Sequence, residues 1–245
     1  MARAQQSQSL PIPIIKGDKS SADVDYRDNL LTNMFGVVKD IKGAKGYIMS
    51  HYGLDTLATG KGRDRGANWN ERLRVHYRAS GDRLISVNQD GTVVDQGYIG
   101  GFKQTSMPYS FNTQGILSDG RFFLHNGASL SEITDPDLGT PIDAVWIDGY
   151  YFMTDGEYLF HTNIADETKI DPLTFATAEF SPDPTLGLGT TQDNKVIVFG
   201  RYTTEYFQNI ASENFAFTRL SNRALKVGIV GTHAKCELAG QWFIM

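Results

Sequence analysis

A short phrase recurs along this chain: a turn that ends in glycine or asparagine, followed by an apolar strand rich in aromatic residues. The clearest copies are SDGRFFLHNG and IDGYYFMTDG, and a looser copy is QDNKVIVFG. The intervals are 39, 29, 45 and 46 residues, measured between the turn residues Gly81, Gly120, Gly149, Asn194 and Gly240. A period of about 40 to 45 residues with several strands per unit is typical of a β-propeller blade. The 29-residue interval predicts a compact blade or one that lacks a strand.

Turn chemistry and composition favour the same all-β fold. The phrases NQDGT, MTDGE and LSDGR place Asp-Gly between strands, which suits tight hairpins with positive φ. The chain has 25 glycines together with 14 Phe, 11 Tyr and 3 Trp, a balance of turn formers and strand formers. One four-stranded blade cannot bury both of its faces, so the blades must stack on one another. An irregular β-sandwich with similar turns is the alternative.

The chain divides into three predicted parts. Residues 1–24 read as an extended arm, because Pro11 and Pro13 disfavour helix and the flanks are polar. Residues 25–70 are expected to hold a short helix at 26–34, a strand at 46–54 and a basic loop. Residues 71–245 are expected to form about four complete blades and a truncated fifth. Since AGQWFIM at the end is an unshielded apolar strand, we expect this sequence to be the leading portion of a larger propeller.

Composition excludes several classes of protein. The net charge is −5, from 23 Lys and Arg against 28 Asp and Glu, so a generally basic nucleic-acid binder is excluded. The single cysteine, Cys236, excludes a disulfide scaffold and a cysteine-rich zinc site. The N-terminus lacks the apolar region of a secretory signal, and no run approaches the roughly 18 apolar residues of a membrane span. We therefore expect the protein to fold in a cytoplasm and to stay soluble.

A basic stretch within residues 55–72 has almost no hydrophobic periodicity and reads as an exposed loop. Basic side chains release phosphate counterions on binding, and an aromatic side chain such as Trp69 can stack on a base, so the loop raises a nucleic-acid hypothesis. A solvated connection is the alternative. The nucleic-acid contacts that this hypothesis predicts are Lys61, Arg63, Arg65 and Arg72.

No pattern in the sequence predicts catalysis, a metal or a cofactor. The five histidines show neither helical i, i+4 spacing nor a metal-binding pattern, and the glycines of LGLGTTQDNK lack the Lys-Ser/Thr of a phosphate loop. A propeller glycosidase would need two or three converging carboxylates. The conceivable members of such a set are Asp90, Asp148, Asp155 and Glu205, for which ordinary turn roles are the alternative.

Several phrases together resemble the tail accessory hub proteins, or packaged DNA stabilisation proteins, of lambdoid short-tailed phages (podoviruses). The resemblance runs in order over nearly all of the chain, from the proline-containing start to the aromatic strand at the end. The basic stretch at residues 61–72 has no counterpart in the family pattern. The matching elements are Asp25-Tyr26, Asn33-Met34, Gly46-Tyr47, Arg65-Gly66, LGLGT with VIVFG, Thr204-Glu205-Tyr206-Phe207 and GIVGTHAK at 228–235.

This resemblance implies a structural protein of the virion tail without enzymatic activity. It implies a homo-oligomeric ring, hexameric in the family, that assembles below the portal and contacts the portal-adaptor proteins, the tail needle and the tailspikes. Such a ring extends the tail channel and helps to retain packaged DNA, which passes nearby without sequence-specific binding. The alternative is a β-propeller glycosidase or carbohydrate-binding module.

Overall fold

The computed structural model describes residues 34–37, 47–164, 166–178 and 182–245, which belong to two units, Met1–Thr56 and Leu57–Met245. In the first unit, β1 (Met34–Val37) pairs antiparallel with β2 (Tyr47–Ser50). β2 falls within the strand predicted at 46–54. The predicted arm, 1–24, lies outside the described residues, as does the predicted helix at 26–34 except for Met34, which begins β1.

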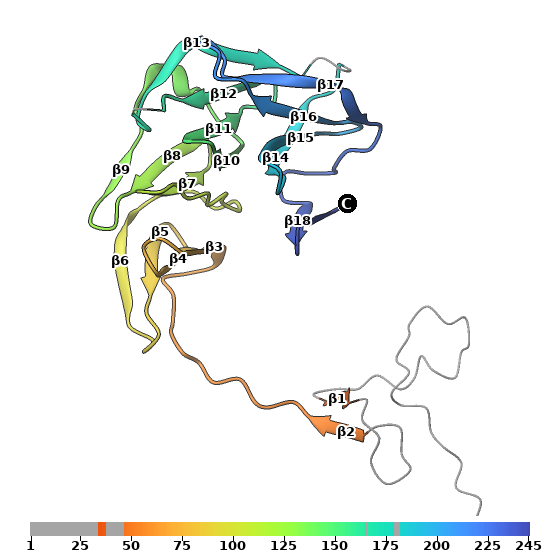
Figure 1. The fold of residues 1–245 in the computed structure, drawn as a ribbon. Coiled ribbons are helices and arrows are strands. Elements are labelled where there is room, and N and C mark those ends of the chain that lie inside the picture. Colours follow the sequence, from red (N-terminus) through yellow and green to blue (C-terminus); the bar gives the residue numbers. More distant parts are fainter. Residues whose placement is uncertain (1–33, 38–46, 165, 179–181) are drawn as a thin grey trace, which may run out of the picture. The chain divides into compact units, whose positions relative to one another are not determined.

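The second unit is a succession of antiparallel sheets joined in chain order (Figure 1). The first sheet has β3 (Asp64–Asn70), β4 (Val75–Ser80), β5 (Arg83–Val87) and β6 (Val93–Tyr98). The second has β7 (Gln114–Ser118), β8 (Arg121–His125) and β9 (Leu130–Glu132), followed by a 3₁₀ turn at Pro136–Leu138.

The remaining sheets continue the same pattern. The third sheet has β10 (Asp143–Ile147), β11 (Tyr150–Thr154), β12 (Tyr158–Thr162) and β13 (Ile170–Thr177). The fourth has β14 (Thr185–Thr190), β15 (Lys195–Gly200), β16 (Thr204–Asn209) and β17 (Phe217–Leu225), and the fifth has β18 (Lys235–Leu238) and β19 (Gln241–Ile244). The fold is thus the predicted all-β arrangement of propeller blades, in which β3, β10 and β14 lie toward a common centre and β6, β9, β13 and β17 lie at the rim.

Each pair of consecutive sheets encloses its own hydrophobic cluster. Tyr77 and Phe123 belong to the cluster between the first two sheets, and Phe122 and Tyr151 belong to the next. Further clusters join the third sheet to the fourth and the fourth to the fifth. Because a middle strand such as β15 is covered on both faces, its sequence KVIVFG is apolar at consecutive positions instead of alternating.

Two Asp-Gly hairpins have positive φ at both central residues, whereas in Asp90-Gly91 and Asp155-Gly156 only the glycine has positive φ. Asp119 and Gly120 have φ of 48° and 77°, and Asp148 and Gly149 have φ of 51° and 90°. Positive φ at both central residues defines the turn whose twist matches the flanking strands.

The predicted cause of the 29-residue interval needs correction. Gly120 lies in the turn between the second and third positions of its blade, whereas Gly149 lies between the first and second. The turn residue from which the interval is measured therefore lies one hairpin earlier in the third blade than in the second, and this shortens the interval. The second sheet does have three assigned strands, but its first position is occupied by residues 105–109, which touch β7 through bridges from Ser106 and Tyr109.

The predicted exposed loop at 55–72 is wrong over residues 64–70, which form β3, the first strand of the first blade. The boundary predicted at residue 71 therefore falls after this strand. β3 lacks an apolar face because it pairs with β4 through its backbone and buries polar side chains, Arg65 and Asn70. Within the described residues, no helix is long and apolar enough to cross a membrane.

Candidate functional site

The inner strands β3, β10 and β14 are the first strands of their blades. We call the end of the sheets where these strands begin the starting end, and the end where they stop the finishing end. The backbone N–H of Thr105 donates to the carbonyl of Arg65 at 2.9 Å, and that of Thr185 donates to Gly156 in the turn beside the start of β10 at 2.9 Å. The starts of the inner strands therefore gather at one end, and their final residues gather at the opposite end. Each end holds a distinct set of functional groups.

Asp143 lies at the starting end and connects four blades. Its carboxylate accepts hydrogen bonds from the Ser106 hydroxyl, from the backbone N–H of Leu188 on β14 at 2.7 Å, and from Lys235 Nζ on β18 at 2.6 Å. The side chains of Asp143 and Lys235 are only 3% and 10% exposed. The burial of this ion pair indicates a structural role, since neither charge faces solvent.

Arg65 joins the first blade to the second at the same end. Its guanidinium donates to the hydroxyl of Ser118 at 3.0 Å and to the carbonyls of Lys103 and Gly100 at 3.1 and 2.5 Å. The residue is only 4% exposed, and burial lowers the pKa of the guanidinium from its usual value. Arg65 was predicted as a nucleic-acid contact, but its side chain is committed to the blade interface.

The other predicted nucleic-acid contacts do not form one cluster. Lys61 and Arg63 are exposed near the start of β3, where the Arg63 carbonyl accepts from the N–H of Gly81. Arg72 is exposed in the β3–β4 turn at the opposite end of the strand. A seven-residue strand separates these positions by roughly 20 Å, at about 3.3 Å per residue.

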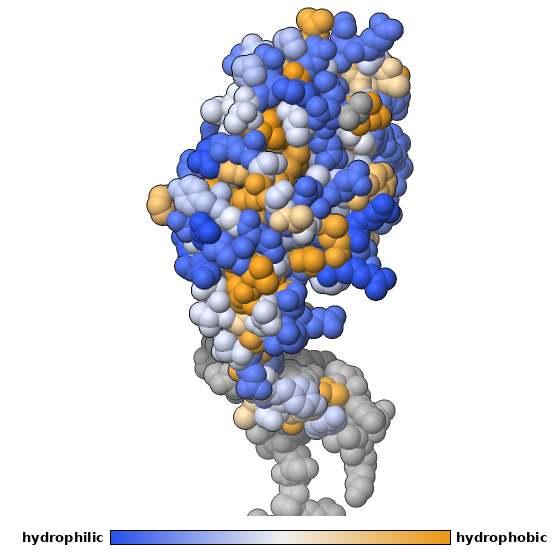
Figure 2. Space-filling view, turned by 90° about the vertical axis from the view of Figure 1, so that its left-hand side faces the viewer, coloured by the Kyte–Doolittle hydropathy of each residue, from blue (hydrophilic) through white to orange (hydrophobic). Residues whose placement is uncertain are grey.

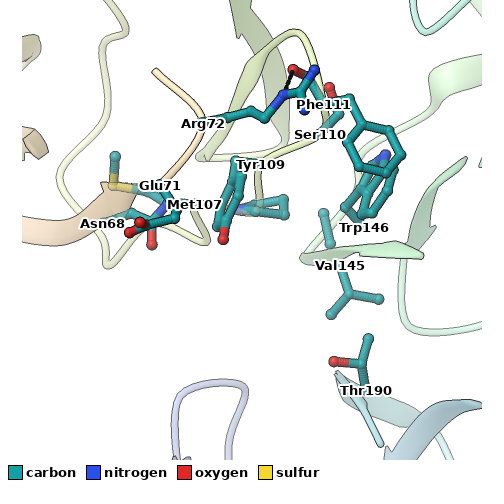
Figure 3. Close-up of a pocket in the computed structure, with 12 residues that line it drawn as sticks. Asn68, Glu71, Arg72, Met107, Tyr109, Ser110, Phe111, Val145, Trp146 and Thr190 are labelled. Atoms are coloured by element: carbon teal, nitrogen blue, oxygen red, sulfur yellow. Dashed lines mark hydrogen bonds between the residues drawn. The ribbon is translucent and has the colours of Figure 1, made fainter. Parts of the chain in front are cut away.

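The finishing end of the inner strands holds a pocket of about 630 Å³ (Figure 3). β3 and its following turn, the segment after residues 105–106, β10 and β14 all contribute to it. Its walls are formed by Asn68, Glu71, Arg72, Met107, Pro108, Tyr109, Ser110, Phe111, Ala144, Val145, Trp146 and Thr190.

One buried side chain fixes the irregular wall of this pocket. The Gln114 amide group donates to the carbonyls of Met107 and Pro108 at 3.1 and 3.0 Å, and its oxygen accepts from Asn68 and Asn70 on β3. These side-chain bonds add to the two backbone bonds that β7 donates to this segment, from Leu117 to the Ser106 carbonyl and from Gly115 to the Pro108 carbonyl. Residues 107–111 can therefore turn their side chains into the pocket.

Aromatic rings dominate the open side of the pocket. Phe111 meets Trp146 edge to face, with ring centroids 4.8 Å apart, and the Arg72 guanidinium lies over the Phe111 ring at 5.4 Å. Arg72 also donates to the Phe111 carbonyl at 3.2 Å. Phe111 is 59% exposed and Tyr109 is 37% exposed, whereas the indole nitrogen of Trp146 is buried without a hydrogen-bond acceptor among the described residues.

The four carboxylates that the sequence analysis singled out do not gather in one pocket as glycoside hydrolysis requires, although Asp90 lines a second pocket together with Glu71. Among the residues lining the first pocket the acidic one is Glu71, which accepts from the Trp69 indole at 2.5 Å. The predicted carboxylates lie apart: Asp90, Asp148 and Asp155 occupy different turns, and Glu205 lies on β16, 3.8 Å from Arg219. Within the described chain, histidine, cysteine and acidic side chains form no cluster suited to a metal ion.

Sequence reasoning did not identify the pocket. Its aromatic wall comes from MPYSF, which lies between strands and has no regular period. The available signal was the presence of two aromatic residues in a connection, where solvent exposure disfavours them.

Comparison with known proteins gives consistent matches. The model of a family described as bacteriophage P22 Gp10, beta-propeller, matches residues 10–245. The tail hub protein gp10 of Salmonella phage P22 is 28% identical over 248 residues, covering 94% of this chain and 51% of the relative. The chain thus spans about half the length of that relative.

Solved structures give weaker similarities. Selenomethionine-substituted virginiamycin B lyase from Staphylococcus aureus is 11% identical, with a TM-score of 0.49 over 77% of this chain and 62% of the lyase. The WD40 domain of Neurospora crassa Pan2 is 7% identical, with a TM-score of 0.47 over 67% of this chain and 50% of that domain.

Proposed function

Because this chain belongs to the β-propeller family of bacteriophage P22 Gp10, we propose that it is a structural subunit of a phage tail hub, located in the virion. The observation that carries the proposal is the family match over residues 10–245, together with a relative that is itself a tail hub protein. The buried connections between blades support a rigid docking body, since four hydrophobic clusters and the Asp143–Lys235 pair join its sheets.

In this proposal the subunits form a ring, hexameric as the family resemblance implies, below the portal. The ring continues the tail channel, helps to retain packaged DNA and anchors the tail needle and the tailspikes. A net charge of −5 suits a conduit for DNA, because like charge limits adhesion of the passing genome. Figure 2 shows hydrophobic areas set among hydrophilic ones on one face of the molecule, a mixed surface of the kind that protein contacts use.

The test is assembly with the phage's own portal-adaptor complex. Purified full-length protein is expected to co-sediment with this complex, and electron microscopy is expected to show added density below the portal. Particles made without the protein are expected to lose their DNA, and the wild-type gene supplied in trans is expected to restore retention. Absence of binding together with normal DNA retention would contradict the proposal.

A glycosidase role is tested on the same preparation. We expect no hydrolysis of host polysaccharide. Cleavage that disappears in Glu71→Gln would instead favour the enzymatic alternative, since Glu71 is the carboxylate lining the pocket.

Contact with DNA through the exposed basic residues remains a separate proposal. If Lys61, Arg63 and Arg72 neutralise phosphates, replacing all three with glutamine should weaken binding to duplex DNA and reduce the slope of log affinity against log salt by about 3. Unchanged affinity and slope would exclude these contacts.

A further inference from the structure

The aromatic pocket at the finishing end of the inner strands is not explained by the proposed role as a rigid docking body. Its wall at residues 107–111 replaces a regular strand, and Gln114 holds that wall in place through two backbone carbonyls. We propose that this pocket binds residues 10–15 of a second copy of the chain, Leu-Pro-Ile-Pro-Ile-Ile.

The pocket calls for an apolar occupant that also carries a hydrogen-bond acceptor. Phe111 and Tyr109 expose large ring surfaces beside Pro108 and Met107. The buried indole N–H of Trp146 has no acceptor among the described residues, and such an unsatisfied donor costs about 1–3 kcal/mol. A ligand carbonyl that reached this donor would recover that cost.

Residues 10–15 have the matching chemistry. Two prolines alternate with apolar residues, in a stretch whose neighbours are polar. Proline fixes φ and lacks an N–H, so such a segment loses little entropy on binding and presents its carbonyl groups outward. Aromatic grooves recognise proline-containing segments on this basis.

Charge complementarity favours the same occupant. Lys16 follows the apolar run and Asp18 comes two residues later, while the pocket presents Glu71 and Arg72 side by side in sequence. A segment with both signs of charge after its apolar residues therefore suits this rim. The assignment to a second copy rests on the proposed function, because a ring brings the same two surfaces of neighbouring copies together at every contact.

Disulfide trapping between two tagged full-length chains tests the proposal. One chain carries Ile12→Cys and the other carries Tyr109→Cys, and both carry Cys236→Ser to remove the exposed native thiol. The matched control replaces Tyr109→Cys with Leu173→Cys, an exposed position on β13 that is 66% accessible. Because a disulfide forms only when Cα atoms approach within about 7 Å, its yield reports proximity.

We expect the heterodimer of the Ile12→Cys and Tyr109→Cys chains to form at least about fivefold more than the control pair. Adding Pro11→Ala and Pro13→Ala to the first chain should lower that yield toward the control. Equal yields for the two pairs would overturn the proposal, as would a cross-link that forms only when both cysteines occupy one chain. Mass photometry of the same mixtures reports ring formation separately, so intact rings without the cross-link would refute this inference and leave the proposed function standing.

Discussion

Replacing Asp143 with asparagine removes the negative charge that connects four blades. The variant leaves the Lys235 ammonium, only 10% exposed, without its counterion, and it can turn an amide donor toward the N–H of Leu188. At 2.6 Å and an effective dielectric constant of about 20, the gross attraction between the two charges is about 6 kcal/mol, part of which offsets their desolvation. Breaking one partner of a buried pair costs about 3–5 kcal/mol, and we expect a loss of that size in the free energy of unfolding.

Urea unfolding followed by tryptophan emission measures this loss, with the slope against urea checked for constancy. The matched control is Glu132→Gln, which breaks the exposed pair with Arg121 and should cost less than about 1 kcal/mol. The double variant Asp143→Asn with Lys235→Met should cost less than the sum of the single changes, because it removes the stranded charge. If Asp143→Asn unfolded within about 0.5 kcal/mol of the control, the carboxylate would not be the connection described here.

Three further predictions concern single residues. Phe122→Ala should lower the free energy of unfolding by about 3–5 kcal/mol, since its ring is fully buried between the second and third blades, and a urea midpoint close to that of wild type would contradict this. Arg65→Lys should lower thermal stability although the charge is kept, because an ammonium group cannot reproduce the fork of bonds to Ser118 and Gly100; an unchanged Tm would refute the assignment. Burial lowers the pKa of His125 below its usual 6.5. As the pH falls below about 6.5, the unfolded chain therefore binds a proton at His125 more readily than the folded chain does. Stability should therefore decrease on acidification through that range, and His125→Gln should flatten the dependence of the urea midpoint on pH; an equally steep profile would exclude His125 as a contributor.

The middle strands and their hairpins could be predicted from the sequence, because the second, third and fourth blades are covered on both faces and the turns need positive φ. The run KVIVFG and the Asp119-Gly120 turn illustrate these two signals. β3 could not be predicted in this way, since its stability comes from backbone pairing with β4 and from buried polar groups, which leave no hydrophobic period. The register of the repeat was misplaced for a related reason: Asp-Gly occurs at both the first and the second hairpin of a blade, so the turn alone does not identify the position.

The candidate site was harder to predict than the fold. The basic residues between 61 and 72 look like one patch in the sequence, but β3 carries them to opposite ends and buries Arg65 between. The pocket requires side chains from four blades to meet, and such long-range proximity has no local signature. Trp146 in particular lies on a strand whose sequence, DAVWI, is ordinary for a blade.

The side-chain clamp of Gln114 gives the second blade a freedom that the others do not have. The Gln114 amide binds the backbone carbonyls of Met107 and Pro108. These hydrogen bonds do not depend on which side chains this stretch carries. Substitutions at Tyr109 or Phe111, which belong to none of the four hydrophobic clusters, can therefore change the shape and polarity of the pocket while those clusters stay intact. Changes at these two positions should therefore avoid the loss of stability that changes in the blade cores would bring.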